Sequence, residues 1–408
     1  MLFINSRRVI PVLLCLFFAA TVANAAPDTP TLASAIRAGY ERNPELALTG
    51  AIRDQSSAIR QQAESLLAAD PSVMLRHESD AATGSDGYRY WEGGLEMPLW
   101  LPGQRHRRSQ VALAMENEAD STSRFQEWNV AGEIRELLWS LRIAETRLEL
   151  ARRAVQSARS LEVDVSKRVD AGELPRNDLV IVQAETLARE VDQTAAASNR
   201  DILLSSYRLA TGLAVPPVVI VEEKTHVAGI SEDHPALQNA LVAARRAYAE
   251  RDQVRGEKWS NPHLTIGSKT ERPGSGWSYD TALIVQVNVP LGTASHAAPG
   301  IAAAERQLAE VKSAALTVQR DLEKALIRAT GEIQQSERAL KLSEQQQHLT
   351  AEGLRLTRRA FELGESDLYT LLQARKRALE TELDLRMRRD ELGRAVSRYN
   401  QALGVVPQ

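Results

Sequence analysis

The sequence predicts a mainly helical protein made of two equivalent halves, each with a pair of short β-strands and a long helical hairpin. Three observations predict this fold. A set of motifs occurs twice, 191 or 192 residues apart; two long stretches contain almost no proline or glycine; and four segments of about ten residues alternate between apolar and polar side chains. The fold class we expect is therefore mainly α, with a small β part of four strands per chain and an internal two-fold structural repeat.

The repeated motifs begin helices, end strands and mark the breaks in the long helices. The pairs are Asn43-Pro44 with His234-Pro235, Met97-Pro98-Leu99 with Val289-Pro290-Leu291, Ala171-Gly172-Glu173 with Leu363-Gly364-Glu365, and Ser205-Ser206-Tyr207 with Ser397-Arg398-Tyr399. This period is far longer than that of a solenoid. We expect a first repeat over residues 26–213, a linker over 214–233 and a second repeat over 234–408.

The first 25 residues have the pattern of a secretory signal peptide. Arg7 and Arg8 precede an apolar stretch too short to span a bilayer, and Ala23-Asn24-Ala25 supplies the small residues of a cleavage site. A retained membrane anchor is the alternative. The single cysteine, Cys15, follows the bulky Leu14, which argues against a lipid attachment site, so the mature chain has no cysteine for a disulfide.

Charge and composition exclude some classes of protein. The net charge is −3, and removing two arginines with the signal peptide changes it to −5, whereas a nucleic-acid binder normally carries a basic excess. Aromatic residues make up only 5% of the chain and charged residues 25%. This composition is typical of long helices with narrow apolar stripes rather than of a bulky globular core.

The first repeat begins with short elements. We expect a helix over Thr31–Asn43 and a second over Glu45–Ala69, because Pro44 is well suited to a helix start. Strands follow at about residues 72–79 and 89–99, joined by a polar, turn-rich loop at 80–87.

A long helical hairpin completes the first repeat. The helix over Gln104–Ala171 should end at Gly172 and Pro175, and Asn177 or Asp178 should cap the return helix to about Gly212. Apolar residues recur mostly every three, four or seven positions and predict coiled-coil packing. They are Ile134, Leu138, Leu141, Leu148, Val155, Val165 and Val169, then Leu187, Val191, Ile202, Leu209 and Leu213 on the return helix.

The second repeat follows the same plan. We expect a helix over Pro235–Lys258, strands at about 263–270 and 278–289, a long helix over Gly300–Leu363 and a return helix over Leu368–Leu403. The tips of the two hairpins should lie near residues 172–178 and 364–367. The side chains of Leu138, Leu141, Leu322 and Leu383 should be buried between helices.

The strands have the length and alternation of tilted membrane-spanning strands. Aromatic residues gather beside the loops, as in the belts at bilayer interfaces: Tyr88, Tyr90 and Trp91, then Trp277 and Tyr279. A soluble four-stranded sheet packed on helices is the alternative. Because an open sheet would expose unpaired backbone groups to lipid, membrane strands would have to pair between chains, and about three chains give a barrel with a lumen.

These paired motifs, over essentially the whole mature chain, resemble the TolC family of outer-membrane factors. The resemblance implies a homotrimer in the outer membrane of a Gram-negative bacterium, with a 12-stranded transmembrane β-barrel and a long α-helical coiled-coil barrel in the periplasm. It implies an exit duct for an inner-membrane pump that is joined to it by a periplasmic adaptor, or membrane fusion protein. Phe361 to Arg375 resembles the heavy-metal-efflux, CzcC-like branch, which implies metal cations from an RND-type pump.

Other functions stay open beside this one. Within the same family the chain resembles ducts for drug or small-molecule efflux or for type I secretion. A different class is a soluble periplasmic coiled-coil scaffold or pump adaptor, although an adaptor would need a lipoyl-like β-domain in its hairpin.

Chemistry-bearing motifs are missing from the sequence. There is no His-Glu-x-x-His and no Gly-x-x-x-x-Gly-Lys-Ser/Thr, and no nucleophile stands beside a base. We therefore expect that the protein is not an enzyme and has no cofactor, no metal ligands and no catalytic residues. The energy for transport would then come from a partner.

The candidate site lies at the two hairpin tips, where we expect a periplasmic aperture and the adaptor-docking surface. Its residues are Arg168, Asp170, Gly172, Glu173, Arg176, Asp178, Gly364, Glu365 and Asp367. In a trimer, Glu365 and Asp367 would give six carboxylates that favour cations, and Arg168 and Arg176 would pair with them and hold the aperture closed. Ordinary helix capping by these charges is the alternative.

Overall fold

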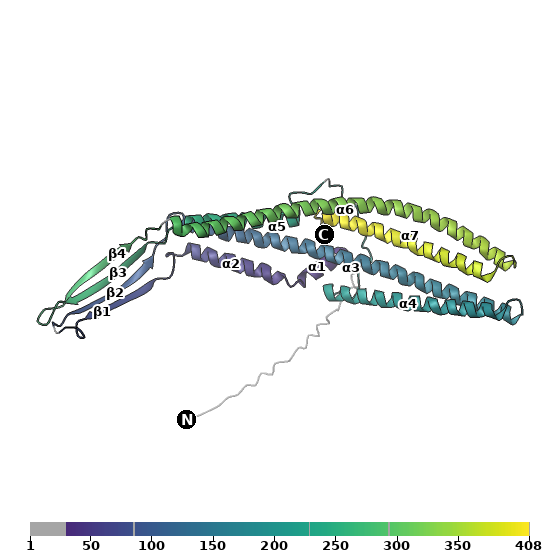
Figure 1. The fold of residues 1–408 in the computed structure, drawn as a ribbon, viewed down its shortest axis with the longest axis horizontal. Coiled ribbons are helices and arrows are strands. Elements are labelled where there is room, and N and C mark those ends of the chain that lie inside the picture. Colours follow the sequence, from purple (N-terminus) through teal and green to yellow (C-terminus); the bar gives the residue numbers. More distant parts are fainter. Residues whose placement is uncertain (1–29, 85, 228, 293, 408) are drawn as a thin grey trace, which may run out of the picture.

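The computed structural model describes residues 30–84, 86–227, 229–292 and 294–407; the predicted signal peptide lies outside the described residues. The molecule is elongated, with a β-sheet at one end and the tips of two helical hairpins at the other (Figure 1). The predicted fold class is confirmed, because long helices dominate and the strands form one small antiparallel sheet.

Four strands make up the sheet in the described part of the chain: β1 (Ser72–Ser79), β2 (Arg89–Pro98), β3 (His263–Arg272) and β4 (Asp280–Asn288). They pair antiparallel in the order β1-β2-β3-β4. The central pair, β2 with β3, joins the two repeats into a single sheet.

Each strand continues into a helix, and these helices keep the order of the strands. Side by side next to the sheet lie α2 (Leu46–Glu64), α3 (Gln104–Asp170), α5 (Pro235–Gly256) and α6 (Ala294–Glu362) (Figure 1). They continue β1, β2, β3 and β4, respectively, along the length of the molecule. The short helix α1 (Leu32–Glu41) packs against α3. The chain is therefore a curved layer one helix thick.

The half of the molecule farther from the sheet contains the two hairpins. Helix α3 returns as α4 (Arg176–Thr211), α6 returns as α7 (Leu368–Ala402), and α3 also contacts α7. The order across this half is therefore α4-α3-α7-α6. One long edge of the chain consists of β1, α2 and α4, and the opposite edge consists of β4 and α6.

Equivalent glycines in the two repeats adopt the same backbone conformation. Gly172 and Gly364 end the long helices with φ of 78° and 77°, and Gly212 and Gly404 end the return helices with φ of 73° and 82°. A positive φ costs glycine little, so glycine suits each of these four ends. Helix α1 has no counterpart ahead of α5 in the second repeat.

The main hydrophobic core lies at mid-length, where α1, α3, α4 and the linker meet. Its buried side chains are Ala35, Ile36, Val130, Ala131, Ile134, Leu138, Trp139, Tyr207 and Ile220. Leu138, Leu141 and Leu322 are buried as predicted, at 2%, 2% and 7% exposure. Leu383 is partly buried in the single chain, so its full burial between helices stays a prediction.

The apolar residues on α4 depart from the prediction. Leu187, Val191, Ile202 and Leu209 are 61–79% exposed in the single chain. Helix α4 packs on α3 and touches α1, which leaves its other side open. Within the single chain these side chains are therefore not packed against a helix, and their coiled-coil packing stays a prediction.

Two predicted helix ends need correction. Helix α2 ends at Glu64, not Ala69, because side chains from the next segment take its last carbonyls: Arg105 donates to Ala63 O and Glu64 O at 2.8 and 2.9 Å, and Trp100 donates to Ser65 O at 3.0 Å. Helix α6 starts at Ala294 rather than Gly300, with Pro299 inside its second turn, where proline removes only one backbone hydrogen bond.

The linker is anchored although it has no regular structure. Ile220 enters the core, and Glu222 forms a two-pronged ion pair with the buried Arg135 of α3, at 2.5 and 3.0 Å. Ser397 of α7 also donates to Glu222, at 2.6 Å. One carboxylate thus ties the linker to helices from both repeats.

His234 is buried at the start of α5 in its neutral form. Its Nδ1 accepts a hydrogen bond from the backbone N–H of Ala236 at 3.2 Å, and its ring stands edge-on to Trp128, with centroids 5.1 Å apart. Burial lowers the pKa of His234 and outweighs backbone hydrogen bonds that would raise it. A proton on Nδ1 would break the helix cap.

Stability should therefore fall as the solution becomes acidic. The folded pKa lies below the unfolded value of about 6.5, so the contribution of neutral His234 is complete above that pH and is lost as pH falls through the folded pKa. Denaturant unfolding at pH 7.5 and pH 5.0 should show a smaller loss for His234→Asn, which keeps a capping side chain, than for the wild type. Equal losses in the two proteins would contradict this role.

Candidate functional site: a two-faced sheet and paired hairpin tips

The two faces of the sheet differ sharply in polarity. Residues directly opposite each other in neighbouring strands share a face, and the face alternates along each strand. The register therefore assigns every strand residue to one of two faces.

One face is polar and the other is apolar. The polar face carries Arg76, Glu78, Tyr90, Glu92, Glu96, Thr265, Lys269, Glu271, Asp280 and Gln286, with Met74 and Ile284 as apolar exceptions. The opposite face carries Val73, Leu75, His77, Trp91, Leu95, Met97, Leu264, Ile266, Leu283, Val285 and Val287. The same face also carries polar residues, which are Ser268 and, toward the loop end, Ser79, Arg89, Thr270, Arg272 and Thr281.

Acidic residues outnumber basic ones on the polar face, with five carboxylates against the side chains of Arg76 and Lys269. On the apolar face, Leu75, Leu283 and Val285 are 63–76% exposed in the single chain. A soluble sheet would not leave such a continuous apolar surface uncovered. The pattern fits a sheet that separates lipid from a polar interior.

At the first tip, a chain reversal is fixed by local hydrogen bonds. The backbone N–H of Glu173 donates to Arg168 O at 2.8 Å across Gly172. The Arg168 guanidinium pairs with Glu173 at 3.1 Å and also lies 5.0 Å from the ring centre of Phe361, which belongs to the other hairpin. Helix α4 begins at Arg176 directly after Pro175, so neither Asn177 nor Asp178 is its cap, contrary to the prediction.

At the second tip, Asp367 caps α7, which is the role given above as the alternative for the tip charges. Its side chain accepts a hydrogen bond from the backbone N–H of Thr370 at 2.7 Å. Hydrogen bonds from the backbone and side chain of Thr370 lower the pKa of the exposed Asp367 carboxyl group. Capping therefore accounts for Asp367 within one chain.

The two tips lie side by side because a small hydrophobic cluster joins them. Its buried members are Leu161 and Val165 of α3, Val182 of α4, Phe361 of α6, and Leu368 and Leu371 of α7. All site residues predicted from the sequence are thereby gathered at one end of the molecule (Figure 1).

The charges at the tips are arranged differently from the predicted latch. Among the described residues, Asp170, Arg176, Asp178 and Glu365 form no ion pair, and Arg168 pairs with Glu173 rather than with Glu365 or Asp367. Within one chain, the latch between the two tips is therefore not formed. Pairing between neighbouring chains stays a prediction.

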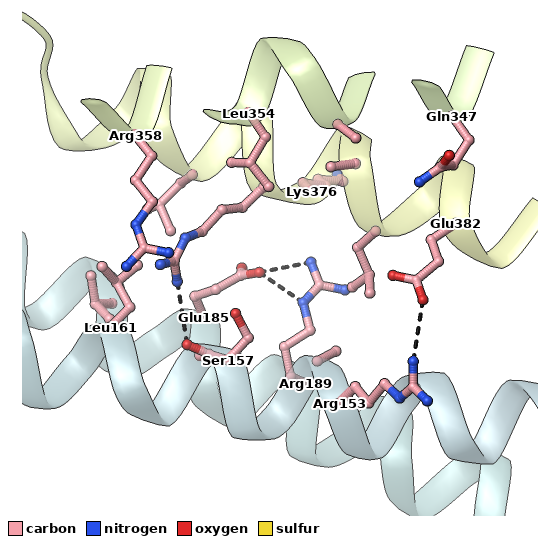
Figure 2. A pocket seen from close by; sticks show the side chains of 18 residues that line it. Arg153, Ser157, Leu161, Glu185, Arg189, Gln347, Leu354, Arg358, Lys376 and Glu382 are labelled. Atoms are coloured by element: carbon pink, nitrogen blue, oxygen red, sulfur yellow. Dashed lines mark hydrogen bonds and ion pairs between the residues drawn. The ribbon is translucent and has the colours of Figure 1, made fainter. Parts of the chain in front are cut away.

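Sequence reasoning missed a groove between the two hairpins, which lies next to the tips on the side toward the sheet. The groove has a volume of about 360 Å³ and is lined by all four hairpin helices, with Arg358 and Lys376 facing Glu185, Arg189 and Ser157 (Figure 2). Five basic side chains line it, from Arg153, Arg189, Arg358, Arg375 and Lys376, against the carboxylates of Glu185 and Glu382. The run Arg375-Lys376-Arg377 was the only sequence signal, and it reads as an ordinary solvated helix face.

Among the described residues, no group of three or more His, Cys, Asp or Glu side chains is arranged to hold a metal ion. No described helix combines the length and apolar character needed to cross a membrane.

Comparisons with known proteins identify the class. Residues 230–405 match the profile of the family described as outer membrane efflux protein. The fold matches that of CusC, with a TM-score of 0.74 and 14% identity over 91% of this chain and 92% of that one. It also matches a membrane protein from Pseudomonas aeruginosa (TM-score 0.72, 17% identity, 91% and 90% coverage) and the CmeC outer membrane channel of Campylobacter jejuni (0.72, 13%, 91% and 85%). No curated protein sequence matches.

The family profile and the shared fold agree with the resemblance found from the motifs. The second repeat matches the outer membrane efflux protein family, and over 91% of the chain the fold is that of solved outer-membrane channels. The predicted membership of the CzcC-like branch stays a prediction.

The cap at the second tip can be tested separately from its charge. Asp367→Ala should speed hydrogen exchange in the first turn of α7, because the amide of Thr370 loses its partner. Asp367→Asn should leave exchange nearly unchanged, since asparagine also caps helices. Peptide-level mass spectrometry over residues 367–373 provides the measurement, and equal exchange in all three proteins would mean that the cap is dispensable.

Proposed function

We propose that three copies of this chain form a channel in the outer membrane that serves as the exit duct of a tripartite efflux system. The sheets would form a 12-stranded barrel in the membrane, and the helices would continue as a tunnel in the periplasm. A periplasmic adaptor would dock at the hairpin tips and connect the tunnel to an inner-membrane pump.

The observation that carries the proposal is the pair of open edges along the chain. In one chain, β1 and β4 each pair with a single neighbour, and the layer of helices ends at α2 and α4 on one side and at α6 on the other. Placing β1 beside β4 of another copy continues the antiparallel alternation. A head-to-tail contact of this kind closes into a ring, and three copies supply twelve strands and an open lumen.

Exposed apolar side chains lie on both edges, where this ring would bury them. Val180, Leu187, Val191, Ile202 and Leu209 of α4 are 55–79% exposed, and Leu316, Ile327, Leu342, Leu349 and Leu356 of α6 are 55–72% exposed. Three of the α6 residues are spaced by seven, the repeat of a coiled coil. We infer that α4 of one chain packs against α6 of the next.

The sheet supports a membrane barrel over a soluble scaffold. Its apolar face would meet lipid, and its polar face would line the lumen. The alternative of a pump adaptor has less support, because within the described residues the strands all belong to one sheet at the end opposite the tips.

For the exported substrate we propose metal cations from an RND-type pump. Two features support this: the likeness of residues 361–375 to the heavy-metal branch and the excess of carboxylates on the polar face of the sheet. Rings of carboxylates favour cations in a pore.

Trimer formation is the first test. The mature protein in mild detergent should have the mass of three chains, and a stable membrane-inserted monomer would contradict the proposal. Leu342→Asp with Leu349→Asp should leave the helical content of the chain intact but dissociate the trimer, because each charge would be buried at a cost of several kcal/mol. Lys341→Asp with His348→Asp, also exposed and spaced by seven but about 100° around the same helix from the leucines, is the matched control and should stay trimeric.

Single-channel recording in planar bilayers tests the aperture. Glu365→Gln with Asp367→Asn removes six carboxylates from a trimer while retaining a capping side chain, and it should lower cation preference and raise resting conductance. Glu92→Gln with Glu271→Gln, on the polar face of the sheet, should lower cation preference only. If the tip variant changes neither quantity, its carboxylates are simple helix caps.

A further inference from the structure

The groove between the hairpins contains positive charges that the chain itself leaves uncompensated. Arg375 donates a hydrogen bond to the backbone carbonyl of Ser157 at 3.3 Å, but no carboxylate of the described residues lies within ion-pair distance of it. Lys376 has neither an ion pair nor a hydrogen bond there. In contrast, both carboxylates of the groove already form ion pairs: Glu185 with Arg189 at 2.7 Å, and Glu382 with Arg153 at 3.4 Å (Figure 2).

The guanidinium of Arg375 is in an unfavourable environment for a cation. It is partly buried, and Arg358 on the neighbouring helix α6 places a second guanidinium in the groove, although Arg358 itself pairs with Glu362 at 3.2 Å. Burial and Arg358 lower the pKa of Arg375, and the more distant Asp164 opposes them. An arginine nevertheless keeps its charge at neutral pH. A partly desolvated cation next to another cation is stabilised when an anion lies between them.

We propose that this groove is a binding site for a small oxyanion, a polyvalent carboxylate or a phosphate, held by Arg358, Arg375 and Lys376. Arginine presents a planar fork of donors that matches carboxylate and phosphate oxygens, and charge-assisted hydrogen bonds of this kind are the strong ones. The hydroxyl of Ser157 and the guanidinium of Arg189 line the opposite wall on the other hairpin. A volume of about 360 Å³ accommodates an anion of the size of citrate.

A bound anion would link the two hairpins of one chain. Arg358, Arg375 and Lys376 belong to α6 and α7, whereas Ser157 and Arg189 belong to α3 and α4. Near the tips, the hairpins otherwise meet through one hydrophobic cluster and a few polar contacts. The anion would therefore stabilise the tips in the arrangement seen here. The site is contained in one chain, so the inference does not depend on the proposed transport function.

The test uses the purified mature protein in detergent, with sodium citrate and sodium phosphate as probes and sodium chloride as the monovalent control. Calorimetric titration should give one anion per chain, and the melting temperature should rise with citrate or phosphate but not with the same ionic strength of chloride. Binding should weaken at 0.5 M chloride as screening increases. Citrate alone, or phosphate alone, would identify which oxyanion class fits.

A pair of double variants separates this site from general surface charge. Arg375→Ala with Lys376→Ala should weaken binding by about tenfold or more. Without added anion its melting temperature should change little, because the loss of repulsion between Arg375 and Arg358 offsets the loss of the hydrogen bond from Arg375 to Ser157 O. Arg388→Ala with Arg389→Ala removes the same charge from the same helix, at residues paired with Asp384, Glu391 and Glu344, and should leave binding unchanged.

Either of two results would overturn the proposal. If neither oxyanion binds at 20 mM, the groove is not a site for small anions. An acidic helix of a partner protein would then be the remaining candidate to compensate its charge. If both double variants bind as tightly as the wild type, the anion sits elsewhere on the protein.

Discussion

An antiparallel sheet of four strands leaves two rows of backbone N–H and C=O groups unpaired within its own chain, one along β1 and one along β4. In lipid each unsatisfied group costs several kcal/mol, so an isolated chain cannot keep this sheet in a membrane. The remaining architecture is consistent with that constraint. Helices α2 and α6 extend the two open edges beneath the sheet, and exposed leucines and valines continue them along α4 and α6. The same surfaces that would destabilise a monomer are those that a ring of copies would bury.

The duplication places a second requirement on the chain, because its two halves must be held in one layer. The central pairing of β2 with β3 does this at the sheet. At mid-length the linker joins the two halves, because Glu222 accepts hydrogen bonds from both Arg135 and Ser397. A buried ion pair is weak evidence for stability by itself, since desolvation offsets much of the attraction. Here it fixes where an otherwise irregular segment crosses the helices of both repeats.

The end of the molecule that carries the hairpin tips is less tightly packed than the middle. The tips meet through one hydrophobic cluster, and the groove above them gathers cations that repel one another. A region with few buried contacts and unfavourable charge pairs changes conformation more readily than a packed core. This would suit the aperture predicted at the tips, which would open when an adaptor docks. It also explains why an anion or a partner charge would have its greatest effect there.

The sequence by itself determined the repeat, the four strands and their alternation, and the glycines at the hairpin tips. Each of these depends on local backbone preference or on spacing along the chain. The end of α2 at Glu64 could not be predicted, because Arg105 and Trp100 reach its carbonyls only in the folded chain. The solvent exposure of Leu187 and Leu209 on α4 also depended on which helices lie beside it. The same is true of the tip charges and the groove. Local sequence named Arg168, Glu173 and Asp367, but only the packing of four helices decided that Arg168 pairs with Glu173 and that Arg375 faces Arg358 without a carboxylate.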